Sequence, residues 1–137
     1  MAEALNVIMR WLHIGSVATL IGGMLYAWRV VEPGLGAVSP QSRDAVAEEA
    51  ARHFRPLVYG AITALLVSGA YNILSNPGHT LYYHVLLAVK LLLVAHIFSV
   101  ALLTVRPKAE RRARLMAGAA ISGLCVILIS AYLRRIF

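Results

Sequence analysis

The sequence predicts an all-α membrane protein: a four-helix antiparallel transmembrane bundle with a short amphipathic surface helix in the first loop. Composition is the first observation behind this prediction. The chain is 60% hydrophobic with a mean hydropathy of +0.74, which lies outside the range of soluble globular domains. The segregation of charge is the second, because residues 11–28 and 115–133 carry no formal charge and residues 56–105 carry only Lys90.

These uncharged stretches set the predicted helix boundaries. A span needs about 20 apolar residues, so residues 56–105 hold two spans, joined by a turn at the Ser-Asn-Pro-Gly sequence of residues 75–78. The predicted transmembrane helices cover about residues 4–31, 54–74, 81–105 and 111–135. Pro33 and Gly34 are expected to end the first helix. All four belong to one integral-membrane domain, residues 1–137.

The first loop is polar and of mixed charge. Ser39, Pro40 and Gln41 form a helix start signal, and the residues that follow alternate apolar and charged types at helical spacing. We therefore expect a short amphipathic helix over about residues 40–53, lying at the membrane surface.

The basic residues indicate a membrane topology and no nucleic-acid partner. The net charge is +7 and the pI about 10.2, but the basic side chains flank the spans and form no aromatic-interleaved surface. They gather in the first and third loops, while residues 76–80 carry none. The positive-inside rule then places loops 32–53 and 106–112 in the cytoplasm and both termini outside. The lipid bilayer is the expected partner.

Lys90 is the most informative side chain, because a charge near the middle of a membrane helix costs at least about 2.5–3.5 kcal/mol. Three interpretations remain open. The ammonium could snorkel to the outer headgroups along its flexible stem. It could belong to a structural hydrogen-bonded pair. It could also have a functional role, holding an anionic cofactor carboxylate or moving a proton.

His13 is the candidate partner of Lys90 and the candidate metal ligand. Both lie about nine residues into helices that run in the same direction, which predicts a similar depth. Met9 comes one turn before His13, and Met24 lies on nearly the same helix face; imidazole with thioether suits copper, while imidazole alone suits haem iron. The alternative is a core histidine bonded to a neighbouring helix. His96, a further cofactor-binding candidate, is turned about 120° from Lys90 around their helix.

Small residues at four-residue spacing predict where helices touch, because they allow close backbone approach in lipid. The predicted contact positions are residues 15, 19 and 23 in the first helix, 60, 64 and 68 in the second, and 119 and 123 in the fourth. Cys125, the single cysteine, is expected to be a buried small residue.

Several motifs resemble the copper resistance D (CopD) membrane family over about residues 8–135. They are Trp11-Leu12-His13, Ile21-Gly22-Gly23-Met24, Arg29, Glu32-Pro33, residues 51–58, residues 67–72 and the lysine-bearing residues 90–94. This resemblance implies a protein of the bacterial inner membrane that binds or passes copper. His13, Met9 and Met24 would then be the metal ligands.

The chain is also similar to the related HemJ-type protoporphyrinogen oxidases, which share the four-helix plan. That resemblance implies haem b and an oxidoreductase or electron carrier, with His13, Tyr26, Arg29 and Lys90 as the residues carried over. A third possibility is a non-catalytic accessory subunit of a larger membrane complex or a homo-oligomer. The sequence leaves copper or haem b, and enzyme or carrier, undecided.

Overall fold

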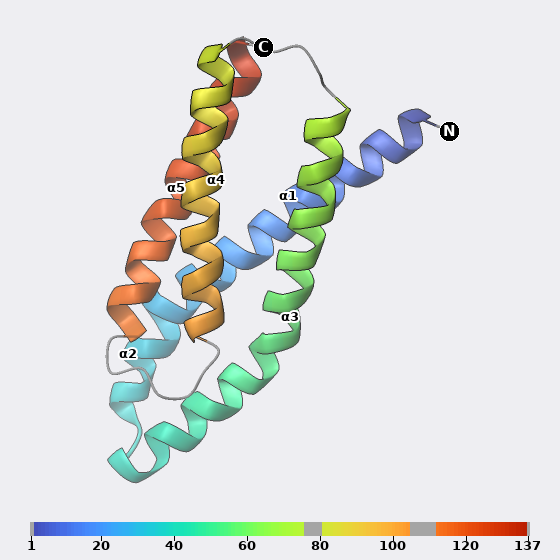
Figure 1. The fold of residues 1–137 in the computed structure, drawn as a ribbon. Helices are drawn as coiled ribbons and strands as arrows, with labels where there is room; N and C mark the ends of the chain where they lie inside the picture. Colours follow the sequence, from blue (N-terminus) through green and yellow to red (C-terminus); the bar gives the residue numbers. More distant parts are fainter. Residues whose placement is uncertain (1, 76–80, 105–111, 137) are drawn as a thin grey trace.

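The fold is a bundle of four long helices that run up and down in chain order (Figure 1). A computed structural model describes residues 2–75, 81–104 and 112–136. Its long helices are α1 (Ala2–Tyr26), α3 (Pro40–Leu74), α4 (Leu81–Thr104) and α5 (Arg112–Ile136). Within the described ranges, four helical segments are long and apolar enough to cross a membrane. The predicted all-α four-helix architecture is therefore confirmed. The predicted turn after Ser75 and the basic residues 106–111 lie outside the described residues.

The helical turns that follow α1 continue further along the chain than the sequence indicated. Past Tyr26 the chain continues as a π-helical turn, Ala27–Val31, then as α2 (Glu32–Gly34) and a 3₁₀ turn, Leu35–Ala37. Pro33 is tolerated because it lies in the first turn of a new helical segment, where a missing N–H costs little. The break falls instead at Val38, which is extended with φ −95° and ψ 148°. Ser39 is also extended, as expected for a residue before proline.

The predicted surface helix and second span form one continuous helix, α3. It is 35 residues long, or about 52 Å at 1.5 Å per residue, which exceeds the roughly 30 Å of a bilayer core. Pro56 lies inside it, where the ring removes one backbone hydrogen bond without ending the helix. The polar first third of α3 therefore continues past the membrane-spanning part, curving away beneath the bundle (Figure 1).

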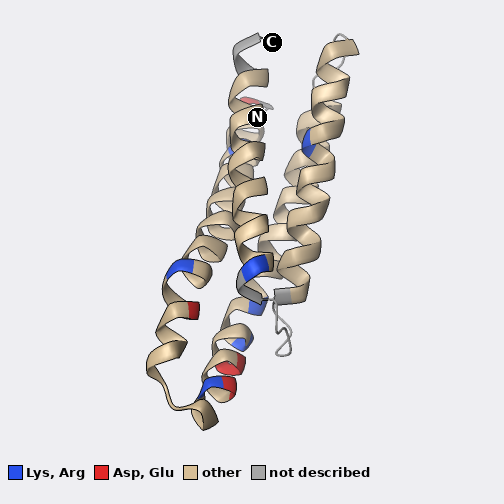
Figure 2. Cartoon of the chain, turned by 90° about the vertical axis from the view of Figure 1, so that its left-hand side faces the viewer, with Lys and Arg blue, Asp and Glu red and all other residues tan. Residues whose placement is uncertain are grey.

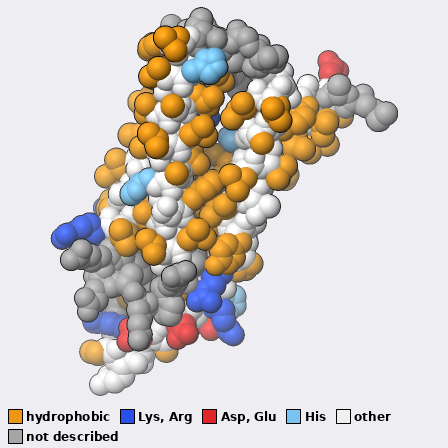
Figure 3. Space-filling model, viewed as in Figure 1, with side chains coloured by type: hydrophobic (Ala, Val, Ile, Leu, Met, Phe, Trp, Pro, Cys, Tyr) orange, Lys and Arg blue, Asp and Glu red, His pale blue; other side chains and the backbone are white. Residues whose placement is uncertain are grey.

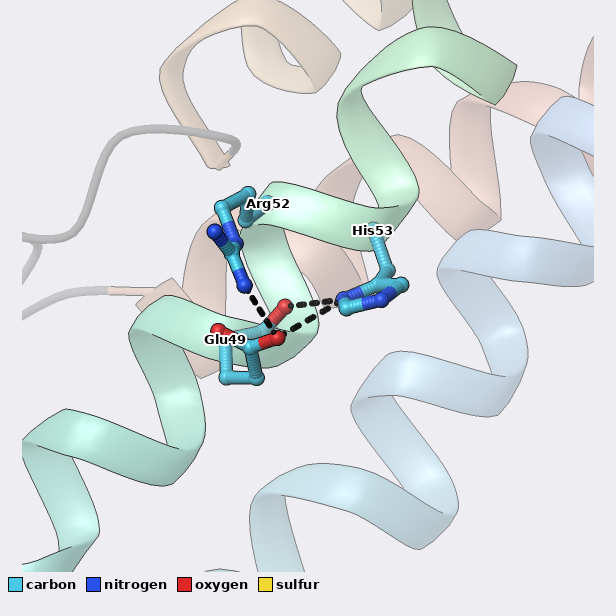
Figure 4. Close-up of polar contacts among 3 residues, drawn as sticks. All are labelled: Glu49, Arg52 and His53. Carbon is cyan, nitrogen blue, oxygen red and sulfur yellow. Dashed lines mark hydrogen bonds and ion pairs between the residues drawn. The ribbon is translucent and has the colours of Figure 1, made fainter.

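The polar end of α3 is held by local bonds. Arg43 donates from Nε to the Val38 carbonyl at 3.0 Å and from Nη2 to the Gly36 carbonyl at 3.2 Å, which ties the start of α3 to the preceding turn. Glu49 accepts a hydrogen bond from Arg52 at 2.7 Å and lies 3.3 Å from His53 (Figure 4). All three side chains are exposed, so this group keeps the segment soluble and contributes little to stability.

Charged side chains gather at one end of the molecule. Figure 2 colours most of the charged residues along the backbone where α1 leads into α3, the end at which these helices project beyond α4 and α5. Trp28 lies next to this charged region, and Trp11 lies at the opposite end of the uncharged residues 11–28. Trp11 is 72% exposed, and tryptophan favours the headgroup level of a bilayer. The apolar middle therefore has an aromatic residue at each edge.

The core lies in the half of the bundle nearest the charged end. All four long helices contribute to one buried cluster: Leu20, Met24, Val58, Ala61, Ile97, Val100, Ala101, Ala119 and Val126. Contacts are closest within the pairs α1–α3 and α4–α5, with α1 also touching α5. Large apolar side chains elsewhere are exposed on every long helix, as a surface in contact with lipid requires.

The predicted small-residue stripes match the helix contacts only in part. A Cβ added to Gly23 would lie 2.5 Å from the Phe54 ring of α3, and one added to Gly123 would lie 2.9 Å from Ile21 of α1. Gly15 and Gly60 have no such neighbour within 4 Å. Cys125 is exposed, so its predicted burial is wrong: it lies on the outer face of α5.

The contact at Gly23 yields a test of the packing. We expect Gly23→Leu to lower the stability of the purified protein by about 1–3 kcal/mol, the usual cost of overpacking. Gly22→Leu is the matched control, because Gly22 has the same chemistry on the same helix but open space around it. Thermal unfolding in mild detergent measures both. Equal unfolding midpoints for the two variants would contradict this packing.

Candidate functional site

Where α1 and α3 cross above the core, two polar side chains meet. His13 Nδ1 lies 2.9 Å from the Oγ of Ser68, and Ser68 is fully buried. The same Ser68 Oγ lies 2.6 Å from the carbonyl oxygen of Ala64 in the preceding turn of α3. Lipid supplies no hydrogen bonds, so these groups must satisfy one another within the protein.

This chain of contacts fixes the tautomer of the His13 ring. At 2.6 Å, Ser68 Oγ and the Ala64 carbonyl can approach only with a proton between them, and the serine hydroxyl has one proton to give. Ser68 therefore donates to Ala64 and accepts from His13 Nδ1–H. In the neutral imidazole, Nε2 then carries the lone pair. A metal-binding histidine is typically oriented in this way, with its other ring N–H donated to a fixed acceptor.

Lys90 faces the interior of the bundle. It precedes Ile97 of the core by seven residues, which places the two on the same face of α4. His13 stands in the same relation to Leu20 on α1. Both residues therefore lie about 10 Å from the core along their helices, at 1.5 Å per residue. Their similar depth in the membrane stays a prediction.

The two residues interact electrostatically across the bundle. Lys90 is close enough for its charge to act on the imidazole of His13, and its side chain is half-buried. Within the described ranges, no carboxylate pairs with Lys90 and no hydrogen bond holds its ammonium. The inward face and partial burial fit a charge directed at the interior rather than one extended to the headgroups.

The other sequence candidates lie elsewhere. Met24 is 1% exposed within the core cluster and follows His13 by eleven residues, about 16 Å along α1, too far to share an ion. Arg29 lies at the charged end, in the π-helical turn, with its guanidinium 5.4 Å from the Trp28 ring centre. His96 is exposed and faces α5, where its Nε2 would lie 3.9 Å from a Cβ added to Gly118. Only Met9, half-buried one turn before His13, remains on the same stretch of α1.

The bundle is open on one side, between α3 and α4. α3 and α4 barely touch, in contrast to the closely packed pairs α1–α3 and α4–α5. Figure 3 views this side: the surface is hollowed between α4 and α3, and a histidine side chain is visible within the hollow. The opening gives an amphiphilic group in the bilayer a route to the interior.

Sequence reasoning missed two parts of this region. Ser68 was assigned to a small-residue stripe, and nothing in its local sequence shows that it accepts from His13. A polar cavity of about 220 Å³ also lies one turn above His13, lined by Asn6, Arg10, Tyr71, Asn72 and Ser75. Asn6, Tyr71 and Ser75 each fall near a helix end, where polar residues are unremarkable.

The arrangement offers one neutral nitrogen ligand beside one ammonium. Among the described residues, no group of three or more His, Cys, Asp or Glu side chains could hold a metal ion. These two groups suit a metal that is already held in an organic ring. The imidazole can form a single axial bond to the metal, and the ammonium can pair with an acidic substituent of the ring.

Comparison with known proteins adds no relative, because no family model, curated protein or solved structure matches the chain. The likeness to the CopD and HemJ families therefore stays a prediction from motifs.

The Ser68 bond can be tested by its removal. Ser68→Ala leaves the Nδ1–H of His13 without its acceptor, and an unsatisfied buried polar group costs about 1–3 kcal/mol. We expect a loss of stability of that size in detergent. Ser99→Ala is the control, because Ser99 is exposed and bonds only the Ala95 carbonyl in its own helix. A Ser68→Ala protein as stable as the Ser99→Ala protein would show that the bond is unimportant.

Proposed function

We propose that this chain is a membrane-embedded haem b protein, acting as an electron carrier or oxidoreductase. His13 would be the axial ligand through Nε2, and Lys90 would pair with a propionate. The observation that carries the proposal is the His13 ring itself: Nδ1 is anchored to Ser68 while Nε2 faces no described partner. The resemblance to HemJ-type oxidases supports the same assignment.

The charges around His13 favour haem over a bare copper ion. An ammonium near His13 repels an incoming cation and attracts a carboxylate. Haem brings its own four nitrogen ligands and two carboxylates, so it needs only one protein nitrogen and a cationic neighbour. Copper would require further ligands, and Met24 lies too far away to supply one.

Bound haem would supply one-electron chemistry, with a potential set by the ligand and its surroundings. The chain's own residues supply the rest. Ser68 orients the His13 ring and, by accepting its N–H, makes Nε2 a better donor. Lys90 places a positive charge in a weakly screened region, where it attracts an acidic group more strongly than it would in water.

Copper binding is the second candidate, and one observation favours it. Met9 lies one turn before His13 on α1 and is half-buried, so its thioether and the imidazole can reach one ion. Such a pair suits a soft copper ion that is transferred rather than stored. This is the activity that the CopD resemblance implies.

The charge distribution supports a membrane placement for either function. We propose that the charged end, with residues 32–53 and 106–112, lies in the cytoplasm and that both termini lie outside, as the positive-inside rule requires. The bacterial inner membrane is the expected location from the family resemblance. The exposed apolar faces would contact lipid, a second copy or a larger complex.

One preparation separates these functions. Protein purified in mild detergent should show a Soret band and iron near one per chain, and both should be lost in His13→Ala. His96→Ala is the matched control and should keep them, because His96 faces α5. If the protein instead binds copper, shows no Soret band and loses the copper in His13→Ala, the cofactor is copper and not haem. If neither iron nor copper is bound, the accessory-subunit role remains.

A second test addresses Lys90. Lys90→Met should leave the apoprotein as stable as before or more stable, since it removes a charge held at a cost. Haem affinity should fall about tenfold, a loss of about 1.4 kcal/mol, and Lys90→Arg should restore most of it. Haem titration and thermal unfolding measure the two effects. Unchanged haem affinity in Lys90→Met would remove the lysine from the site.

A further inference from the structure

The polar cavity one turn from His13 is not part of the proposed haem site. It lies where the start of α1 meets the end of α3, and the residues that line it are of polar types: Asn6, Arg10, Tyr71, Asn72 and Ser75. Its volume is about 220 Å³, room enough for a small polar group with water. No acidic side chain is among the described lining residues, so Arg10 makes the lining net positive.

Hydrogen bonding makes the lining rich in donors. Tyr71 donates its hydroxyl proton to Asn6 Oδ1 at 2.6 Å. That bond identifies the Asn6 oxygen as the acceptor and fixes the orientation of the amide, so its NH₂ group can donate to a ligand. The Arg10 guanidinium adds up to five N–H groups and Ser75 a hydroxyl. Among the described residues, no ion pair involves Arg10.

The depth of the cavity matches the headgroup level. Arg10 directly precedes Trp11, whose 72% exposure and aromatic character place it at the membrane–water boundary. The cavity is bounded on the other side by Ser75, the residue at which α3 ends. Phosphate is the abundant anion at this level of a bilayer on either face, and arginine is suited to bidentate phosphate binding.

We propose that this cavity binds a phosphate group, with Arg10 as the principal ligand and Asn6 and Ser75 as further donors. Two sources can supply that chemistry: the headgroup of a phospholipid in the bilayer, or a free phosphate from the aqueous phase. The site is independent of haem or copper binding, because neither His13 nor Lys90 lines it.

The test uses the whole chain in mild detergent. Phosphatidylglycerol, diacylglycerol with the same acyl chains, and inorganic phosphate are titrated separately, and the thermal unfolding midpoint reports binding. We expect phosphatidylglycerol to raise the midpoint and diacylglycerol to leave it unchanged. A rise with inorganic phosphate as well would identify a site for free anions; no rise with it would identify a lipid site. A midpoint unmoved by both phosphate probes would overturn the proposal.

Variants decide whether the cavity is responsible. Arg10→Gln should weaken phosphate binding at least tenfold, whereas Arg114→Gln, an exposed arginine on α5 near the charged end, should leave it unchanged. Equal responses in both variants would show nonspecific charge attraction and overturn the site. If Arg10→Gln does not fold, Ser75→Ala removes a donor without removing a charge and should weaken binding several-fold; an unchanged affinity there would count against the cavity.

Discussion

The hydrogen bond between His13 and Ser68 is the interaction on which the site depends. In lipid, a polar side chain must find its partners within the protein. Ser68 meets this requirement twice, accepting from His13 and donating to the Ala64 carbonyl. The bond joins α1 to α3, fixes the imidazole and leaves Nε2 as the acceptor. Lys90 is the contrasting case, a cation directed at the same interior with no described carboxylate to neutralise it.

The arrangement of the helices explains why these groups remain accessible. Small residues allow α1 to approach α3 at Gly23 and α5 at Gly123, so the four helices close around the core near the charged end. By contrast, α3 and α4 touch little. His13 and Lys90 lie about two turns along their helices from the core residues Leu20 and Ile97. Polar groups at such a position can hold a ligand that a closed core would exclude.

Much of the fold could be predicted from sequence because lipid imposes a simple rule on charge. The long uncharged runs gave the four helices, with α4 and α5 within a residue of their predicted limits at each end. The first loop was harder. Pro33 was expected to stop the helix, but the chain passes it in a new helical segment, and the extended break comes before Pro40. The predicted surface helix and the second span form one helix, α3, because Pro56 removes one backbone hydrogen bond without ending the helix.

The candidate site was predictable only in part. His13 and Lys90 were identified because charged and titratable groups are conspicuous in an apolar span, and helical arithmetic gave their depth. Ser68 was not, because a serine at small-residue spacing has the same local pattern whether it packs or accepts a hydrogen bond. The rise per residue of a helix also excludes Met24 as a ligand of the same ion, since it follows His13 by eleven residues. Cross-helix partners depend on how the helices rotate against one another, which residue spacing along one helix does not encode.

The protonation state of the His13 ring tests the proposed site most directly. Nitrogen NMR on protein labelled with ¹⁵N-histidine, without added metal, distinguishes the two neutral tautomers and the imidazolium. Assignment follows from loss of the His13 signals in His13→Ala. We expect a ring protonated at Nδ1 with a bare Nε2, and a change in that tautomer population in Ser68→Ala. A ring protonated at Nε2 would contradict it, because the nitrogen proposed as the ligand would already carry a proton.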